Sequence, residues 1–290
     1  GADLILATDP DCDRLGCAAP LTSPVGAQWQ TLTGNQIGAL LADYVVESHQ
    51  QRGDLSPQNY LVATLVTTQL MRRIAESYGI RTRDDLLVGF KWIAGVMDDE
   101  GPERFLFGSE ESYGFLAGDH VRDKDASVAA LLLCELAARL KAEGKTIHEK
   151  LDSLFWQHGV HSERTVSVQM PGSEGMSRMK ELMMQFREVP PKELAGTAVK
   201  QARDYLSQAT TLADGTKQPL PGPRGDLVIL DLEQTGNYVA IRPSGTEPKI
   251  KLYMFTYEPP EQLADLDLAK QKLSKRLDKM EADIRDFAAV

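Results

Sequence analysis

Hydrophobic and polar positions in the first half of the chain follow the pattern of a layered α/β protein. Short, nearly continuous apolar runs predict buried strands in three segments, 2–9, 59–68 and 104–112. Apolar residues at helical spacing predict helices in four further segments, 33–50, 69–79, 91–101 and 126–144. Strands and helices that alternate in this way indicate a mostly parallel sheet covered by helices.

The pattern changes after about residue 158. Strict alternation of polar and apolar residues predicts antiparallel strands in three segments, 160–170, 225–244 and 248–257, the second folded around a Thr-Gly-Asn turn. Helical spacing returns at 173–186 and 260–287, and the Pro- and Gly-rich segment 217–225 is expected to be a loop. We therefore expect a second domain of the α+β class with an antiparallel sheet.

Length and composition fit this division. The chain has 290 residues, of which 42% are hydrophobic and 26% charged, and this is enough for about two globular domains. The change of pattern at about residue 158 separates the α/β part of the chain from the α+β domain.

The net charge and the cysteines exclude several classes of protein. A net charge of -10 opposes non-specific binding to nucleic acid or to anionic membranes, so an anionic ligand needs a local basic site. Cys12, Cys17 and Cys134 have no C-x-x-C spacing, which makes a disulfide framework or a zinc site improbable and favours a cytoplasmic location. The sequence has no apolar run of about 18 residues, so we expect no membrane span.

Three acidic residues alternate directly after the first predicted strand, in the stretch ATDPDCDR. The carboxylates of Asp9, Asp11 and Asp13 could converge on one hard cation, whose charge would offset their mutual repulsion, and Mg²⁺ is suited to such oxygen ligands. An EF-hand is excluded because its sixth position should be Gly and is Arg14, and its twelfth should be Glu and is Pro20. The alternative is a solvated acidic turn.

Two further loops carry residues suited to a phosphorylated sugar. In RPSGTEPK, Arg242 can chelate phosphate oxygens, Gly245 permits a close backbone approach, and Ser244 and Thr246 offer hydroxyl and amide groups. In FGSEESYGF, Glu110 and Ser112 could accept and donate hydrogen bonds to vicinal hydroxyls. Each loop could equally be an ordinary turn.

Taken together and in this order, these segments resemble the α-D-phosphohexomutase family, which includes phosphoglucomutases and phosphomannomutases. DPDCDR is similar to the family's magnesium loop, VGFKWI and GSEESYG to its two sugar-binding loops, and RPSGTEPK to its phosphate-binding loop. The residues of these motifs are most similar to those of the bacterial phosphoglucomutases.

The resemblance implies a role for each matching residue. The implied magnesium ligands are Asp9, Asp11 and Asp13, and the implied catalytic cations are Arg14 and Lys124. The implied sugar contacts are Gly89, Phe90, Glu110 and Ser112. The implied contacts to the phosphate that is not transferred are Arg242, Ser244, Gly245 and Thr246.

The resemblance also implies a reaction and a missing part. The family's members have four domains, so residues 1–32, 33–158 and 159–290 would be the end of domain 2, domain 3 and domain 4, and the N-terminal domains would be the chain's partner. The reaction would be isomerisation of a hexose phosphate, by phosphoryl transfer between C1 and C6 through a phosphoserine, with Mg²⁺ as cofactor and a hexose bisphosphate as intermediate and activator.

The family's serine lies in a Ser-His-Asn-Pro motif that this chain lacks, since Ser48-His49 is followed by two glutamines. We therefore expect the chain alone to be inactive. Three alternatives remain: a phosphopentomutase or other member of the family, a phosphatase with an aspartate nucleophile, and a non-catalytic fragment that binds sugar phosphates.

Overall fold

The computed structural model describes residues 2–22, 28–245 and 247–288. The chain divides into two compact units, Gly1–His158 and Gly159–Val290, and each unit is described here by itself. Among the residues described, no helix is both long enough and apolar enough to span a membrane.

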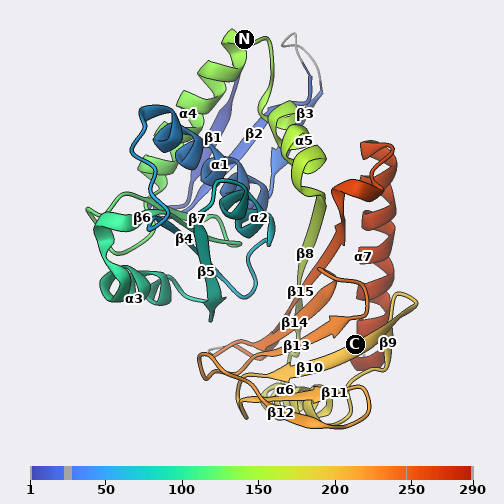
Figure 1. Cartoon of the computed structure of the whole chain (residues 1–290). Coiled ribbons are helices and arrows are strands. Elements are labelled where there is room, and N and C mark those ends of the chain that lie inside the picture. Colours follow the sequence, from blue (N-terminus) through green and yellow to red (C-terminus); the bar gives the residue numbers. More distant parts are fainter. Residues whose placement is uncertain (1, 23–27, 246, 289–290) are drawn as a thin grey trace. The chain divides into compact units, whose positions relative to one another are not determined.

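The first unit begins with a small antiparallel sheet and continues with a larger, mostly parallel one (Figure 1). The small sheet has the order β1-β2-β3, with bounds Ile5–Thr8, Leu15–Pro20 and Trp29–Leu32. The larger sheet has the order β5-β4-β6-β7, with bounds Arg81–Leu86, Tyr60–Thr64, Phe105–Glu110 and Gly114–Ala117. Strand β4 is parallel to β5 and β6, whereas β7 is antiparallel to β6.

Helices cover both faces of the larger sheet. The helices of this unit are α1 (Gly34–Arg52), α2 (Leu70–Ser77), α3 (Phe90–Glu100), α4 (Ala126–Ala142) and α5 (Ile147–His158), with a short 3-10 turn at Pro102–Arg104. Alternate residues of β4 point to opposite faces of the sheet. Tyr60 and Val62 lie on one face and pack against Ile93 of α3. Helices α1 and α2 lie against the other face. The predicted α/β class is confirmed.

The start of α1 shows how the sequence sets these elements. Thr33 caps the helix: its hydroxyl accepts a hydrogen bond from the backbone N–H of Gln36, and the Gln36 side chain accepts one from the N–H of Thr33. This reciprocal capping box satisfies two of the backbone donors that a helix start leaves free. The helix predicted from residue 33 is therefore confirmed, and its cap lies directly after β3.

The prediction of a buried parallel strand at the start of the chain was wrong. Strand β1 is largely exposed, with Ile5 53% accessible, and it runs antiparallel to β2 at one edge of its sheet. An apolar run indicates that a strand can be buried, but burial also requires a layer on each face. Within the described residues, β1 has one neighbouring strand and an open face.

The second unit is an antiparallel sheet with helices on one face, as the sequence predicts. Its strand order is β12-β11-β10-β13-β14-β15-β8, and β9 pairs with β10. The strands are β8 (Val160–Gln169), β9 (Glu193–Leu194), β10 (Thr197–Asp204), β11 (Ala209–Leu212), β12 (Lys217–Pro219), β13 (Val228–Leu232), β14 (Tyr238–Pro243) and β15 (Lys249–Glu258). The expectation of a loop at 217–225 was wrong for its first three residues, because β12 pairs there with β11 and continues the sheet.

The core of the second unit lies between the sheet and two helices, α6 (Gly175–Glu188) and α7 (Leu266–Ala288), with a short 3-10 turn at Pro260–Gln262 before α7. Alternate residues of β15, including Leu252 and Met254, point toward Met280 and Ile284 of α7. Figure 1 shows α7 alongside β15 and β8. The other alternating residues of β15, which include Lys249 and Lys251, therefore belong to the opposite face of the sheet.

Candidate functional site

The acidic motif forms a tight hairpin between β1 and β2. The backbone N–H of Cys12 donates to the carbonyl of Asp9 at 3.0 Å, and the N–H of Arg14 donates to Asp9 Oδ1 at 3.0 Å. Cys12 adopts a left-handed conformation with φ of 58°. The hairpin turns the chain so sharply that the acidic side chains, which are separated by single residues, come to lie close together.

One oxygen from each of Asp9, Asp11 and Asp13 lies within 4.8 Å of the other two. Asp13 Oδ1 is buried, accepts no hydrogen bond from the described residues, and lies 3.9 Å from Arg14 Nε. Partial desolvation acts to raise the pKa of Asp9, but the N–H and the charge of Arg14 outweigh it and leave that pKa below its usual value. Three ionised oxygen ligands in this arrangement fit Mg²⁺.

Lys124 lies beside this cluster, as the resemblance implies for an active-site cation. Its Nζ is 2.9 Å from Asp13 Oδ2 and 3.0 Å from Asp123 Oδ1. Burial acts to lower the pKa of Lys124, but its bonds to Asp13 and Asp123 prevail and raise it above the usual value. Lys124 is therefore a charged group held at the acidic hairpin.

Glu110 connects two of the predicted sugar loops. It is the last residue of β6, is only 4% exposed, and accepts a hydrogen bond from the N–H of Gly89 at 2.8 Å. Burial raises the pKa of Glu110, although the Gly89 N–H and the charges of Lys124 and Arg14 oppose that rise. The carboxylate is thus fixed where the two loops meet.

The turn that carries Ser112 is pressed between α1 and the metal loop. A Cβ on Gly34 would lie 2.2 Å from the carbonyl oxygen of Glu111, so only glycine permits this approach. The N–H of Leu15 donates to the carbonyl of Tyr113 at 3.1 Å, which attaches the turn to the start of β2. Ser112 itself is half-buried in this turn.

Phe90 occupies a different environment from the one expected of a sugar contact. As the first residue of α3, Phe90 is 5% exposed and packs in the core between that helix and the larger sheet. Lys124 Nζ lies 5.5 Å from the centroid of its ring. The structure therefore brings Asp9, Asp13, Gly89, Glu110 and Lys124 together within the first unit. The role of Phe90 in sugar binding stays a prediction.

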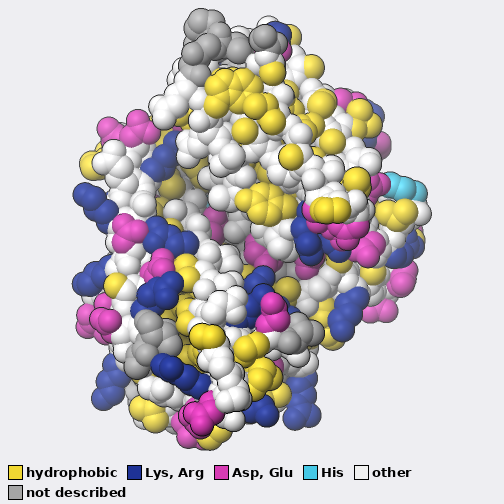
Figure 2. Space-filling model, turned by 180° about the vertical axis from the view of Figure 1, so that it is seen from behind, with side chains coloured by type: hydrophobic (Ala, Val, Ile, Leu, Met, Phe, Trp, Pro, Cys, Tyr) yellow, Lys and Arg dark blue, Asp and Glu magenta, His cyan; other side chains and the backbone are white. Residues whose placement is uncertain are grey.

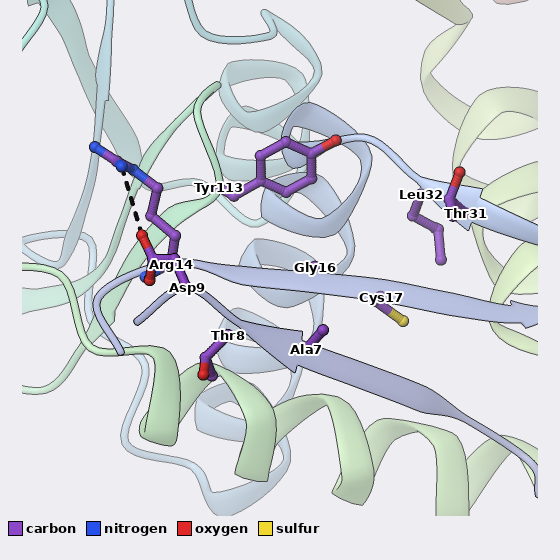
Figure 3. A pocket seen from close by; sticks show the side chains of 9 residues that line it. All are labelled: Ala7, Thr8, Asp9, Arg14, Gly16, Cys17, Thr31, Leu32 and Tyr113. Carbon is purple, nitrogen blue, oxygen red and sulfur yellow. Dashed lines mark hydrogen bonds and ion pairs between the residues drawn. The ribbon is translucent and has the colours of Figure 1, made fainter. Parts of the chain in front are cut away.

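A groove of about 430 Å³ opens beside the carboxylates (Figure 3). It runs over the small sheet between Ala7 on β1 and Thr31 on β3, and Tyr113 overlooks it. At one end, the Arg14 guanidinium forms an ion pair with Asp9 at 3.5 Å. The groove therefore reaches the candidate site at Asp9 and Arg14, and neither Glu110 nor Lys124 lines it.

The predicted phosphate loop lies in the second unit, between β14 and β15. The N–H of Ser244 donates to the carbonyl of Lys249 at 2.8 Å, and the N–H of Glu247 donates to the Ser244 hydroxyl at 3.3 Å. A Cβ on Gly245 would have no neighbour within 4 Å, so the backbone of the loop is open on that side. Thr246 lies outside the described residues.

Two cations stand side by side next to this loop. Arg242 and Lys251 are directly opposite each other on β14 and β15, and neither forms an ion pair in the part of the chain that is described. Like charges in such a position repel, and an anion placed between them would relieve the repulsion. The sequence analysis missed Lys251, although the alternation in KIKLYMF, which buries Ile250 and Leu252, indicates its face.

The remaining surface charge is mixed. On the face seen in Figure 2, Lys and Arg side chains are interspersed with Asp and Glu, with no single large area of one sign. The net charge of -10 is therefore an average over the chain, and it is compatible with a local cationic site such as that of Arg242 and Lys251.

Comparisons with known proteins agree on one family. Residues 33–157 match the family described as phosphoglucomutase/phosphomannomutase, alpha/beta/alpha domain III. A phosphoglucomutase from Staphylococcus aureus (strain MRSA252) is 35% identical over 277 residues, which are 94% of this chain and 47% of that protein. The chain therefore spans about half the length of this curated relative.

Solved structures show the same fold. Parafusin, a phosphoglucomutase from Paramecium, matches 99% of this chain and 46% of its own with a TM-score of 0.64 at 18% identity. A phosphoglucomutase/phosphomannomutase family protein from Burkholderia thailandensis matches 98% of this chain and 47% of its own with a TM-score of 0.55 at 14% identity. The match of residues 33–157 to domain III and the 35% identity to the Staphylococcus aureus protein show that the chain belongs to the phosphoglucomutase/phosphomannomutase family.

Proposed function

We propose that this chain is the C-terminal part of a phosphoglucomutase-type isomerase, which moves a phosphoryl group between C1 and C6 of a hexose phosphate. The observation that carries the proposal is the convergence, within one unit, of the acidic hairpin, Lys124 and the Glu110–Gly89 pair. Cation ligands and hydroxyl-binding groups in one place suit a substrate that is both phosphorylated and rich in hydroxyls. The curated relatives at 35–36% identity are phosphoglucomutases, which supports this substrate class.

The acidic hairpin would hold a magnesium ion. Asp9, Asp11 and Asp13 would be its protein ligands, and the buried Oδ1 of Asp13, which accepts no hydrogen bond from the described residues, supports this assignment. When bound, the ion would neutralise charge on a phosphoryl group during its transfer. Arg14, with its guanidinium half exposed, would contribute a second positive charge on the same side.

The sugar and its second phosphate would be held by the other loops. The Glu110 carboxylate and the Ser112 hydroxyl would bind hydroxyl groups of the ring, while the N–H of Gly89 fixes the position of Glu110. The guanidinium of Arg242, the ammonium of Lys251 and the open backbone of the loop at Gly245 would bind the phosphate that stays in place. These groups position the substrate and leave the covalent step to another residue.

That residue would be a phosphoserine outside this chain, because the sequence contains no Ser-His-Asn-Pro motif. A hexose bisphosphate would then be the intermediate and the activator. We propose that N-terminal domains of the family's kind supply this serine and are the chain's partner.

Binding of glucose 1,6-bisphosphate, followed by amide NMR, tests the proposal. We expect shifts at Gly89 and Ser112 in the first unit and at Ser244 and Gly245 in the second. Glu110→Gln should weaken the first set and leave the second, whereas the exposed control Glu103→Gln should change neither. No shift at either loop would contradict the proposal. A stable phosphoryl group trapped on Asp9 would favour the aspartate-nucleophile phosphatase instead.

A further inference from the structure

Lys124 has surroundings unlike those of the other cation beside the acidic hairpin. Its side chain is 11% exposed and its Nζ is 2.9 Å from Asp13, whereas the Arg14 side chain is 49% exposed and its guanidinium lies 3.5 Å from Asp9 and 3.9 Å from Asp13. The lysine is therefore the more closely held of the two charges at Asp13.

The aliphatic part of Lys124 is fixed by packing. A Cβ on Gly114 would lie 2.4 Å from Lys124 Cδ, so the side chain runs directly over the backbone of β7. Its ammonium is 5.5 Å from the centroid of the Phe90 ring. The lysine thus reaches the acidic hairpin from the side of the sugar loops, and its position does not depend on the ion pair alone.

The Lys124 ammonium lies 2.9 Å from Asp13 Oδ2, so a divalent ion bound through Asp13 Oδ1 would have a like charge at close range and would be repelled by it. We infer that Lys124 is the resident counter-cation of the Asp9, Asp11 and Asp13 cluster, and that a divalent metal ion must displace its ammonium from Asp13 in order to bind. The inference rests on the proposed metal site. It assigns to Lys124 a function in controlling metal occupancy, in addition to the active-site charge that the family resemblance implies.

Displacement has a consequence for the sugar loops. After its ammonium leaves Asp13, the side chain of Lys124 is still held by its packing over Gly114 and beside the Phe90 ring. The ammonium is then still attracted by the carboxylate of Glu110. Metal binding would therefore transfer positive charge from the metal loop toward the loop that binds the sugar. In this arrangement, metal binding and sugar binding are linked through one side chain.

The test measures Mn²⁺ binding to the purified chain, with free Mn²⁺ quantified by electron paramagnetic resonance. We expect Lys124→Met to tighten binding by roughly five- to tenfold, because it removes a like charge next to the ion. Lys141→Met is the matched control, since Lys141 also pairs with a carboxylate, Asp3 at 2.8 Å, but on the exposed surface of α4. It should bind Mn²⁺ as the wild type does.

Asp13→Asn separates failure of the inference from failure of the metal site. If Asp13→Asn leaves Mn²⁺ binding unchanged, the proposed site is wrong. If Asp13→Asn abolishes binding but Lys124→Met fails to tighten it, the site stands and the displacement of Lys124 is disproved. Absence of binding to both the wild type and Lys124→Met also overturns the inference, because the lysine is then not what limits metal binding.

A second measurement does not depend on the folding of a Lys124 variant. In proton–nitrogen NMR spectra of the lysine ammonium groups, the signal of the buried Lys124 should move as Mg²⁺ shifts the amides of the hairpin. An ammonium signal that stays in place while those amides reach saturation would overturn the inference.

Discussion

The acidic hairpin of the first unit and the phosphate loop of the second are both turns between antiparallel strands, yet they differ in how charge is balanced. At the hairpin, Asp9 and Asp13 are neutralised by Arg14 and Lys124 from the same unit. At the phosphate loop, Arg242 lies opposite another cation, and neither forms an ion pair with a described residue. The first site is thus partly compensated by cations of its own unit, whereas Arg242 and Lys251 have no ion-pair partner among the described residues.

This difference has a physical consequence for binding. A ligand of the acidic hairpin must compete with ion pairs that already exist, so part of its binding energy is spent on breaking them. An anion at the phosphate loop relieves a repulsion instead. We therefore expect the isolated chain to bind phosphate more readily than magnesium.

The largest effect expected is on catalysis. The chain alone should turn over glucose 1-phosphate at a rate at least about a thousandfold below that of an intact phosphoglucomutase, even with Mg²⁺ and glucose 1,6-bisphosphate, because the proposed phosphoserine lies outside it. A coupled assay of the purified chain measures this. Robust turnover that is lost in both Asp9→Ala and Arg242→Ala would show that the chain contains its own nucleophile.

Close packing around the lysine of the first site predicts the next largest effect. Gly114→Ala places a methyl group against Lys124 Cδ and should lower the free energy of unfolding by about 1–3 kcal/mol. Gly95→Ala is the control, because its new methyl group meets nothing within 4 Å and lies inside α3. Thermal unfolding should show that this control is unchanged or more stable. Equal stability of Gly114→Ala and wild type would show that Lys124 is not closely packed.

The uncompensated cations of the second site predict a smaller but specific change. Arg242→Ala should weaken phosphate binding by about tenfold, the loss typical of a charge-assisted hydrogen bond, and Lys251→Ala should weaken it less. Amide NMR titration with inorganic phosphate provides both affinities. The surface variant Arg224→Ala serves as the control. If Arg242→Ala binds phosphate as tightly as this control does, the anion site lies elsewhere.

The smallest effect concerns Glu110 and pH. Burial raises its pKa, so the stability that Glu110 contributes is present below its unfolded pKa and is lost as pH rises through its folded pKa. Glu110→Gln has no such titration. The melting temperature of this variant minus that of the wild type should therefore increase between about pH 4 and pH 7, by a few degrees at most. A difference that stays constant across this range would contradict the raised pKa.

Local patterns were sufficient to predict most helices and four strands of the second unit, β8, β13, β14 and β15, but not β9 to β12. They failed where an element depends on distant partners. Strand β5 was missed because RTRDDL has no apolar face, yet Arg81 and Arg83 both form ion pairs with Glu100 at the end of α3, which neutralises them. Strand β1 was misjudged for the opposite reason, since its apolar side chains have no covering layer among the described residues.

The candidate site shows a similar division. The motifs identified Asp9, Asp13 and Glu110 because carboxylates at strand ends are visible in the sequence. The ion pair between Lys124 and Asp13 spans more than one hundred residues, and only the fold brings the two together. Lys251 was missed because its importance lies in its cross-strand neighbour, Arg242, which strand register alone determines.

The contrast between the two loops can be tested most directly on one labelled sample of the wild-type chain. Its amide spectrum is recorded during a titration with inorganic phosphate and, separately, with Mg²⁺. We predict that phosphate shifts the amides of Ser244 and Gly245 at lower concentration than Mg²⁺ shifts those of Asp11 and Asp13, with each ligand acting on its own loop. Phosphate that moves the acidic hairpin first, or Mg²⁺ that saturates the hairpin at a lower concentration than phosphate requires, would contradict the account.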